Sequence, residues 1–350
     1  MKILLTTQVV DEKDPYLSFF VLWLKEFSRH FQTIHVVCLK EGTHSLPGNV
    51  RVHSLGKPSF AKATEGAGRR IFLRLQYISR LLWYAWTLRS EYDAVFVHMN
   101  QEYVLIAGVL WKLLGKQIYL WRNHYAGDVR TDIAALLCKK VFCTSKFSHT
   151  AKYKKTVLMP VGVDTDRFQT AEGVERVSRS VLFFGRFAPS KKPDLLVSAL
   201  KELTQRGVQF FASFYGSALP ADQEYREQVM EDARSLTQIQ FFEGIPNAEA
   251  PRTFSAHDIY VDLGRSGMYN KTIFEAAACG CLVLAASKDF AELVDPQFSF
   301  REDGSDLSRK LQNLLALSDL EREDARTRLR TLAESQSLST LGTQLAIELA

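Results

Sequence analysis

The sequence predicts a two-domain α/β protein in which each domain winds helices around both faces of a parallel sheet. Short apolar runs alternate with longer amphipathic segments in both halves of the chain. A length of 350 residues accommodates two domains of ordinary size. The pattern breaks at Pro160 and Gly162, among polar residues. We therefore expect an N-terminal domain over 1–160, a C-terminal domain over 161–333, and a last helix over 334–350 that packs back on the first domain.

The first half predicts five buried strands and two helices from its apolar periodicity. The strands are expected at 1–10, 33–39, 92–99, 116–124 and 139–145, and the helices at 18–31 and 74–90. The second half repeats this style. Its strands are expected at 181–187, 209–217, 239–245, 256–264 and 282–287, and its helices at 192–207, 223–236, 272–280 and 307–335. Ligands of such sheets bind beyond the carboxyl ends of the strands, which here predicts a site in a cleft between the domains.

The net charge of +5 is unevenly distributed. Residues 1–165 hold 23 Lys and Arg against 12 Asp and Glu, a balance of +11, and the rest hold 21 against 27, a balance of −6. A basic half indicates either an anionic partner or a solvated surface. No recognisable nucleic-acid motif accompanies it, so nucleic acid is not expected as a partner. No run of about 18 apolar residues and no signal peptide is present, and we expect a cytoplasmic protein.

The cysteines and the common catalytic motifs exclude several classes of protein. Five cysteines without a CxxC pair indicate neither a disulfide framework nor a zinc site. Cys279 and Cys281 flank a glycine and are expected to be small buried residues. The sequence also lacks GxGxxG after its first strand, GxxxxGK[ST], HExxH and GxSxG. These absences weigh against hydride transfer, P-loop chemistry, zinc proteolysis and serine hydrolysis.

The segment VLFFGRFAPSKKPDLL places basic residues where a strand gives way to a helix. The expected strand reaches Gly185, Arg186 follows, and Lys191 and Lys192 precede Pro193 at the helix start. Cations beside a helix N-terminus suit a diphosphate. The alternative interpretation is an ordinary solvated basic loop.

A second candidate segment is SGMYNKTIFEAAACG, in which Glu275 precedes a run of small residues. Thr272 and Glu275 fit a capping box, which is the structural interpretation. The functional interpretation is that the Glu275 carboxylate accepts hydrogen bonds from a ligand diol such as a ribose. In that case Lys271 and the amides of the helix start would hold phosphates. Gly280 is expected to end the helix.

Four segments in order resemble retaining GT-B glycosyltransferases of family four. They are PVGVDTDRF, GRFAPSKKPDLLVSAL, FEGIPNAEAPRTFSAHDIYVDLGRSG and FEAAACGCLVLA. The resemblance covers nearly all of 155–290, and the first half of the chain is looser. It implies two Rossmann-like domains that face each other across a cleft, with the nucleotide-sugar donor bound by the second.

The resemblance also implies roles for individual residues. Gly185 and the cations Arg186 and Lys191 would hold the donor diphosphate, and Glu275 would bind the nucleotide ribose. His124 would lie near the donor sugar, with His98 as the weaker candidate. Gly162 would sit at the domain junction.

The sequence departs from the family pattern in the donor loop. Gly267 stands where the family has the first glutamate of its E-x7-E motif, and Val161 stands in place of an asparagine. The loss of that glutamate leaves the donor sugar and the activity open. We expect the loop residues to contact the donor, with Asn270 and Lys271 replacing the missing acid. The loop residues are Gly267, Met268, Tyr269, Asn270, Lys271 and Thr272.

The resemblance implies a hexosyltransferase that uses a UDP-sugar or GDP-sugar, needs no cofactor or metal, and retains the anomeric configuration. The expected acceptor is a glycan or a lipid-linked molecule. A GT-B nucleotide-sugar epimerase and an inactive nucleotide-sugar-binding protein are the alternatives. Peripheral contact with an anionic membrane at its inner face is also expected. We expect the core, rather than a membrane contact, for the apolar residues Phe19, Phe20, Leu22, Trp23 and Leu24.

Overall fold

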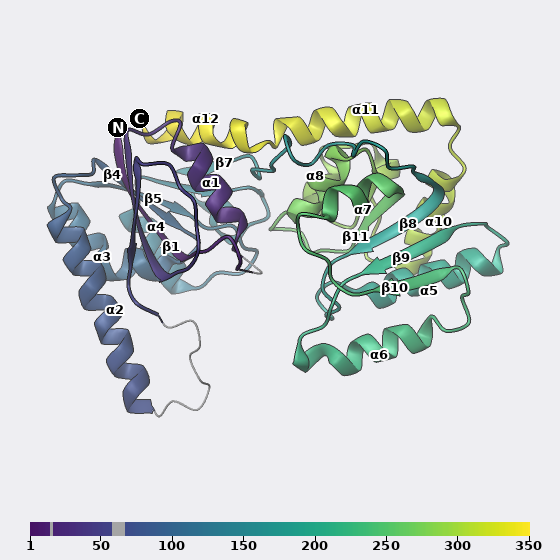
Figure 1. Cartoon of the computed structure of the whole chain (residues 1–350), viewed down its shortest axis with the longest axis horizontal. Helices are drawn as coiled ribbons and strands as arrows, with labels where there is room; N and C mark the ends of the chain where they lie inside the picture. Colours follow the sequence, from purple (N-terminus) through teal and green to yellow (C-terminus); the bar gives the residue numbers. More distant parts are fainter. Residues whose placement is uncertain (15–16, 58–66) are drawn as a thin grey trace. The chain divides into compact units, whose positions relative to one another are not determined.

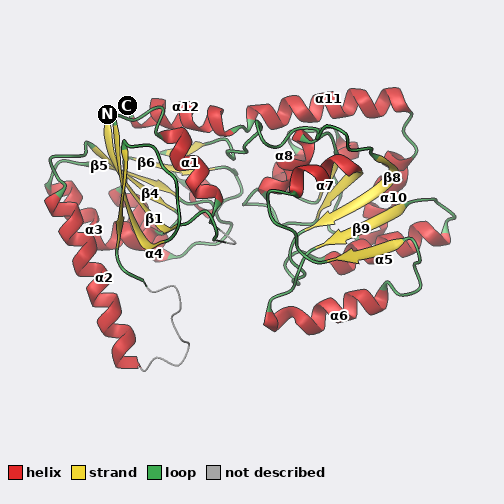
Figure 2. Cartoon of the chain, viewed as in Figure 1, coloured by secondary structure: helices red, strands yellow, loops and turns green. Residues whose placement is uncertain are grey.

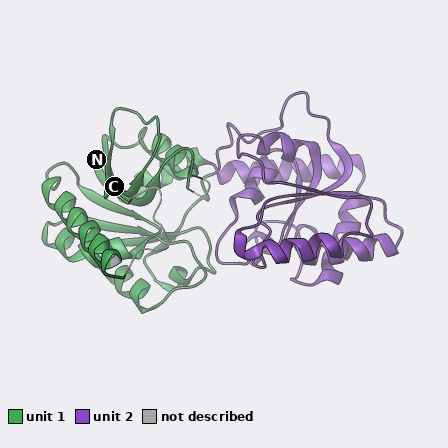
Figure 3. Ribbon diagram, turned by 60° about the horizontal axis from the view of Figure 1, so that its bottom comes forward, with its two compact units in different colours: residues 1–162, 338–350 green, residues 163–337 purple. Residues whose placement is uncertain are grey.

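The computed structural model describes residues 1–14, 17–57 and 67–350 (Figure 1). The chain forms two compact units, which divide after Gly162 and again before Leu338 (Figure 3). The N-terminal unit contains 1–162 and 338–350, and the C-terminal unit contains 163–337. The last helix of the chain therefore belongs to the unit in which the chain begins.

The N-terminal unit consists of one sheet with helices on both faces (Figure 2). Its strands are β1 (Lys2–Val10), β2 (Thr33–Glu41), β3 (Val50–Ser54), β4 (Ala94–His98), β5 (Gln117–Trp121), β6 (Lys140–Cys143) and β7 (Thr156–Leu158). Its α-helices are α1 (Phe19–Phe27), α2 (Ala67–Thr87), α3 (Gln101–Leu113), α4 (Val129–Leu137) and α12 (Leu338–Leu349). The strand order is β3-β2-β1-β4-β5-β6-β7, and every pairing is parallel. The predicted doubly wound parallel fold is confirmed for this unit.

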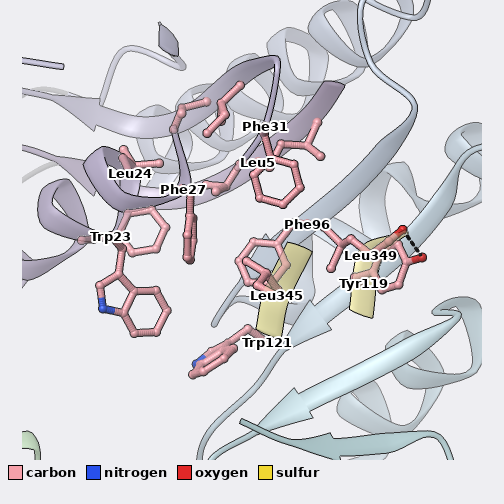
Figure 4. Packing of buried hydrophobic residues seen from close by; sticks show 14 of the residues in the cluster. Leu5, Trp23, Leu24, Phe27, Phe31, Phe96, Tyr119, Trp121, Leu345 and Leu349 are labelled. Carbon is pink, nitrogen blue, oxygen red and sulfur yellow. Dashed lines mark hydrogen bonds between the residues drawn. The ribbon is translucent and has the colours of Figure 1, made fainter. Parts of the chain in front are cut away.

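Alternating side chains of the strands supply two apolar cores. On one face, Phe96 and Trp121 pack with α1 and α12 (Figure 4). The Tyr119 hydroxyl there donates a hydrogen bond to the Leu349 carbonyl at 3.2 Å, which anchors the last helix. On the other face, Val95 and Val97 pack against the inner sides of α2, α3 and α4. Of the apolar residues of α1 that were expected in the core, Phe20, Trp23 and Leu24 are buried. Phe19 and Leu22 are half-buried.

The C-terminal unit repeats the architecture on a smaller sheet. Its strands are β8 (Val177–Phe184), β9 (Phe211–Tyr215), β10 (Ile239–Phe242), β11 (His257–Asp262) and β12 (Leu282–Ala285). Its α-helices are α5 (Pro193–Gln205), α6 (Gln223–Asp232), α7 (Ala250–Ala256), α8 (Lys271–Ala278), α9 (Lys288–Ala291), α10 (Gly304–Leu315) and α11 (Asp319–Ser335). The order is β10-β9-β8-β11-β12, again entirely parallel.

Several elements differ from the sequence-based expectation. The short strands β3 and β7, the helices α3, α4 and α7, and the beginning of α2 at Ala67 were not anticipated. The expectation of a single helix over 307–335 was wrong. The chain breaks at Ser318, whose hydroxyl forms a capping box with Glu321 at the start of α11. A strong cap outweighs continued periodicity because it satisfies amides that would otherwise lack partners.

The five cysteines are buried thiols, and Cys281 donates its thiol hydrogen to the Phe254 carbonyl at 2.9 Å. The expectation that Cys279 and Cys281 are small buried residues is confirmed. Among the described residues, no helix is long and apolar enough to cross a membrane.

Candidate functional site

The strand order of the C-terminal unit marks the place where a ligand should bind. The connection from β8 runs toward β9, whereas β11 continues toward β12 on the other side. β8 and β11 are therefore the adjacent strands at which the winding reverses. Crevices at such switch points, beyond the carboxyl ends of the strands, are the usual ligand sites of open α/β sheets. Both candidate segments of the sequence pass this edge, one directly after β8 and the other between β11 and α8.

The loop after β8 lies against the loop after β9. The Gly185 amide donates to the Tyr215 carbonyl at 3.0 Å, and the Phe187 amide donates to the Ser217 carbonyl at 3.1 Å. A Cβ at Gly216 would lie 1.8 Å from the Gly185 carbonyl oxygen, so a glycine is required there. This close approach fixes the backbone that presents Arg186, whose side chain is exposed.

A tight turn then leads into α5 and carries both lysines. The Lys191 amide donates to the Ala188 carbonyl at 2.8 Å. Lys192 adopts a left-handed conformation (φ 50°) at the N-cap, and Pro193 begins the helix. The Lys192 ammonium forms an ion pair with Glu302. The two neighbouring lysines thus have different surroundings, because Lys191 lies toward α8.

Hydrogen bonds through the Asn270 side chain connect Lys191 to Asp262 at the end of β11. The Lys191 ammonium donates to Asn270 Oδ1 at 2.8 Å, and Asn270 Nδ2 donates to Asp262 Oδ2 at 2.7 Å. Asp262 is buried and also accepts the Gly264 amide at 3.0 Å. A Cβ at Gly264 would lie 2.2 Å from Asn270 Nδ2, so the glycine leaves room for this contact. Asp262 consequently orients the Asn270 amide with its oxygen toward the lysine.

Helix α8 begins with Asn270 as its N-cap, one turn before Glu275. The expected capping box of Thr272 and Glu275 was wrong, because the helix starts two residues too early for Glu275 to reach the cap. The Thr272 hydroxyl instead accepts a hydrogen bond from the Tyr260 hydroxyl at 2.8 Å. The position of Glu275 therefore has no capping explanation.

The end of α8 follows the sequence-based expectation. Gly280 has a positive φ of 83°, its amide donates to the Ala277 carbonyl at 3.0 Å, and the Cys281 amide donates to the Ala276 carbonyl at 3.0 Å. These two bonds form a Schellman motif, which favours glycine at this position. Ala276 and Ala277 are buried. The small residues thus bury α8 while the glycine returns the chain to β12.

Glu275 is the central charged group of the site. It is 8% exposed, and within the described residues its carboxylate accepts no hydrogen bond. Burial raises the pKa of the Glu275 carboxyl to about 7, opposed by the charges of Lys271 and Arg167. Burial lowers the pKa of the Lys271 ammonium to about 7, opposed by Glu275 and Asp164. A buried carboxylate of this kind is prepared to accept hydrogen bonds from a ligand.

The loop before α8 adopts a backbone conformation at Gly267 that favours glycine. Gly267 has φ of 94°, a conformation that side chains rarely adopt, and its amide donates to Asp289 Oδ2 at 2.8 Å. Tyr269 packs edge-on against Phe274 at a ring separation of 5.2 Å, and Met268 is half-buried. The loop therefore takes a course that disfavours an acidic side chain at Gly267.

The N-terminal unit presents His124 in the loop after β5. His124 Nδ1 lies 2.9 Å from the Ala126 amide and 3.0 Å from its carbonyl oxygen, and the ring stacks on Tyr125. The side chain of Asn123 fixes this loop, since Asn123 Oδ1 accepts from the Thr144 hydroxyl at 2.9 Å and the Ser148 hydroxyl at 3.2 Å. The loop thus holds the histidine through its backbone neighbours.

His98 has a different environment, at the end of β4 where the winding of the first sheet reverses. Its side chain is buried and stacks on Phe20 with ring centroids 4.1 Å apart. His98 Nδ1 lies 3.1 Å from the Thr7 hydroxyl oxygen. His98 thus packs as part of the aromatic core, and its rank as the weaker of the two histidine candidates stays a prediction.

Several residues that shape these sites were not anticipated from the sequence. Asp262 orients Asn270, Asp164 and Arg167 set the field around Glu275, and Asn123 fixes the His124 loop. An acidic residue at the end of a buried strand was the available signal for Asp262. The described part of the chain contains no group of three or more His, Cys, Asp or Glu residues that could hold a metal ion.

The C-terminal part of the chain is similar in sequence to proteins described as glycosyltransferases. Residues 191–340 match a family model described as glycosyl transferase-like. A curated relative, a tRNA-queuosine alpha-mannosyltransferase of Drosophila melanogaster, is 25% identical over 154 residues, which cover 44% of this chain and 40% of that protein. The chain thus spans well under half the length of this relative.

Solved structures match over the whole chain and share its fold. HepE of Anabaena in complex with UDP aligns with a TM-score of 0.78 at 18% identity, covering 100% of this chain and 99% of that one. Sucrose-phosphate synthase of Thermosynechococcus elongatus aligns with a TM-score of 0.76 at 16% identity, covering 99% and 98%. These matches show that the chain has the GT-B fold.

Proposed function

We propose that this protein is a retaining GT-B glycosyltransferase of the family-four type, which transfers a hexosyl group from a nucleotide diphosphate sugar to an acceptor hydroxyl. One observation carries the proposal. At the switch point of the C-terminal sheet, Asp262 and Asn270 hold Lys191 beside the first turn of α8, and the same helix carries the buried carboxylate of Glu275. A cation and a hydroxyl-binding carboxylate at one helix start suit the diphosphate and the ribose of a nucleotide.

In this proposal each group has a role defined by its chemistry. Glu275 accepts hydrogen bonds from the ribose hydroxyls with its two carboxylate oxygens. Lys191 and Arg186 bind the diphosphate and stabilise the charge that develops on it. Lys271 and the amides at the start of α8 add positive potential, and the backbone at Gly185 allows close approach of the phosphates.

The proposed reaction keeps the anomeric configuration. The bond between the sugar C1 and the diphosphate oxygen breaks, and the acceptor oxygen forms its bond to C1 on the same face. The acceptor hydroxyl gives its proton to the leaving diphosphate. The cations at the strand end lower the barrier because they are already in place when the charge on the leaving group grows. We expect no cofactor and no metal ion to be required, and transfer that persists in excess EDTA would agree.

The donor is proposed only as a class. HepE has been crystallised with UDP-glucose, whereas the Drosophila relative is named a mannosyltransferase. These two proteins point to different hexoses, so UDP-sugars and GDP-sugars both belong in a test. Gly267 removes the acidic side chain expected near the sugar. We propose that Asn270 and Lys271 contact the sugar instead, and that Met268, Tyr269 and Thr272 shape the loop around it.

The proposed acceptor is a glycan or a lipid-linked molecule in the cytoplasm, at the inner face of the membrane when it is lipid-linked.

The role of His124 near the donor sugar remains a prediction from the resemblance. A His124→Ala variant with unchanged donor affinity and at least tenfold lower turnover would support it. Unchanged turnover would contradict it.

The first experiment is calorimetric titration of the purified protein with UDP, GDP, ADP and their sugars. Glu275→Ala and Arg186→Ala test the site, and Glu227→Ala and Arg234→Ala, exposed on and just after α6, are matched controls. We expect one nucleotide series to bind, with at least a tenfold loss in both site variants and none in the controls. Absence of binding throughout the panel would overturn the proposed site.

Product analysis separates the glycosyltransferase from its alternatives. Transfer to an acceptor, with the anomeric configuration assigned by NMR, supports the proposal. Conversion of the donor into an epimer without an acceptor would indicate a GT-B epimerase. Binding without turnover would indicate an inactive nucleotide-sugar-binding protein, for which the glycine at position 267 is the motivating observation. A Lys271→Ala variant with normal affinity and turnover would remove Lys271 from the proposed donor contacts.

A further inference from the structure

Helix α2 of the N-terminal unit exposes several large apolar side chains along one of its sides. Ile71, Phe72, Leu75, Trp83 and Trp86 have exposed fractions of 59%, 67%, 59%, 59% and 51%. At about 100° of rotation per residue, these five side chains fall within about 120° of the helix circumference. The opposite side of the helix is buried, since Leu81 and Ala85 belong to the core beneath it. The apolar arc thus faces away from the core of its own unit.

The neighbouring helices extend this surface. α3 contacts both α2 and α4, so the three helices form one layer over the sheet (Figures 1 and 2). Five further large apolar side chains of α3 and α4 are exposed on this layer. They are Val109, Leu113, Val129, Ile133 and Leu136. Scattered apolar side chains are normal on a protein surface, but a set of ten on one layer of three adjacent helices is typical of an interaction site.

The charges on this layer identify the kind of partner. The three helices contain six Arg and Lys residues against two Asp and Glu residues, and α2 has no acidic residue. Arg69 and Arg74 lie on either side of the apolar arc of α2 by helical spacing, and both are exposed. Two such faces would bring arginines against arginines, which disfavours pairing of two copies of this chain. An anionic surface with an apolar layer beneath it complements both features.

We propose that the outer face of α2, α3 and α4 binds an anionic lipid bilayer, with α2 lying in the plane of the headgroups. Trp83 and Trp86 would enter the interface, where the indole ring contacts acyl chains while its N–H stays hydrated. Arg69 and Arg74 would contact lipid phosphates beside them. The physical argument stands on this face alone, but its biological meaning rests on the lipid-linked acceptor of the proposed function.

Intrinsic fluorescence reports this binding directly. Of the five tryptophans, Trp83 and Trp86 are exposed, and Trp23, Trp111 and Trp121 are buried. We expect vesicles of phosphatidylcholine and phosphatidylglycerol (3:1) to shift the emission to the blue and to protect it from iodide. Vesicles of phosphatidylcholine alone should bind at least tenfold more weakly. Flotation of the full-length protein with the same vesicles gives the bound fraction independently.

Variants test which side chains are responsible. Flotation of a Trp83→Gln/Trp86→Gln double variant and of Leu75→Gln should fall at least fivefold, and an Arg74→Gln variant should bind roughly fivefold more weakly. Ile347→Gln on α12, at a residue 67% exposed on the opposite side of the sheet, is the matched control and should bind normally. Circular dichroism and thermal unfolding of each variant exclude loss of the fold as the cause.

Three results would overturn the proposal. They are wild-type protein that stays unbound to anionic vesicles, binding that survives all the α2 variants, and a dimer in analytical ultracentrifugation that the same variants dissolve while vesicles have no effect. Nucleotide titration of the same variants keeps the two proposals apart. Normal nucleotide affinity with lost vesicle binding supports the membrane face, whereas normal vesicle binding without nucleotide affinity contradicts only the glycosyltransferase.

Discussion

The two units support the loops at their strand ends with different chemistry. In the C-terminal unit, charged groups gather: Asp262 and Asn270 hold Lys191, and Glu275 lies buried on the helix that follows. In the N-terminal unit, neutral groups fix the loop of His124, since Asn123 accepts hydrogen bonds from two hydroxyls. The first arrangement suits a highly charged ligand such as a diphosphate, whereas the Asn123 contacts position a loop without adding charge. Under the proposed function, the C-terminal unit would bind the donor and the N-terminal unit would bind the acceptor.

The two units also differ in the backbone contacts that support these loops. In the C-terminal unit, Gly185 and Gly216 approach so closely that no side chain fits between their loops. In the N-terminal unit, a Cβ at Gly127 would lie 2.3 Å from the ring of His149. The His149 amide donates a hydrogen bond to the His124 carbonyl, so this ring lies beside the His124 loop. A backbone carbonyl cannot move as easily as a side chain. The C-terminal loop should therefore be the more sensitive of the two to substitution.

The largest effect is expected at Gly216. A Gly216→Ala variant places a methyl group against the Gly185 carbonyl, and the loops must separate. We expect the free energy of unfolding of the C-terminal unit to fall by about 3 kcal/mol and nucleotide affinity to fall with it. Calorimetry measures the first and nucleotide titration the second. Gly304→Ala on α10, where a Cβ meets only ordinary contacts at 3.6 Å, is the control. Equal stability of the two variants would contradict this explanation.

The next effect is expected at Asp262. Asp262→Asn keeps an acceptor for the Gly264 amide but sets one amide donor against that of Asn270. The buried donor left without a partner should lower the free energy of unfolding by about 2 kcal/mol. Lys191 loses its orientation, so nucleotide affinity should fall about tenfold. Thermal unfolding and titration measure both effects. A variant that loses stability but retains full affinity would make Asp262 purely structural.

A smaller effect is expected at Asn123 in the other unit. Asn123→Ala removes the acceptor of the Thr144 and Ser148 hydroxyls and should cost about 1 kcal/mol of stability. Because the His124 loop then moves, turnover should fall at least tenfold while nucleotide affinity stays unchanged. Asn123→Asp retains an acceptor oxygen and should restore part of the turnover. Loss of nucleotide affinity in Asn123→Ala would contradict the division of roles between the units.

The smallest effect is a change in the pH dependence of nucleotide affinity. The raised pKa of Glu275, about 7, means that its carboxylate is protonated as the pH falls below 7. The lowered pKa of Lys271, also about 7, means that its charge is lost as the pH rises above 7. Affinity should therefore peak near neutral pH and fall on both sides, by up to about tenfold per unit.

Replacement of Lys271 by methionine separates the two limbs. The positive charge of Lys271 lowers the pKa of Glu275, so its removal raises that pKa further. In Lys271→Met the acidic limb should move to higher pH and the alkaline limb should disappear. Lys13→Met, at an exposed lysine of the N-terminal unit, is the control. A profile identical to that of the wild type would show that these groups do not contact the nucleotide.

Much of the fold followed from local pattern, and the exceptions have physical causes. Strands such as β4 and β12 were predicted because an unbroken apolar run is typical of a strand buried on both faces. Helix α3 was missed because its sequence QEYVLIAGVLWKL is apolar nearly all round and shows no clear amphipathic period. The edge strand β7 was missed because its three residues give no period at all. The capping box at Thr272 was wrongly predicted because α8 begins two residues earlier than expected. Such a shift changes the residue at every capping position.

The sequence by itself determined the alternation of strands and helices, the parallel sheets, and the presence of a basic loop and a carboxylate near helix starts. Only the tertiary structure decided which polar groups meet. Lys191 and Asn270 are 79 residues apart, and their contact exists because the ends of β8 and β11 lie side by side at one edge of the sheet. Likewise, periodicity made α2 amphipathic, but the packing against α3 decided which of its apolar residues stay exposed. Local sequence sets the direction of a side chain, whereas its partner is set by the pairing of distant strands.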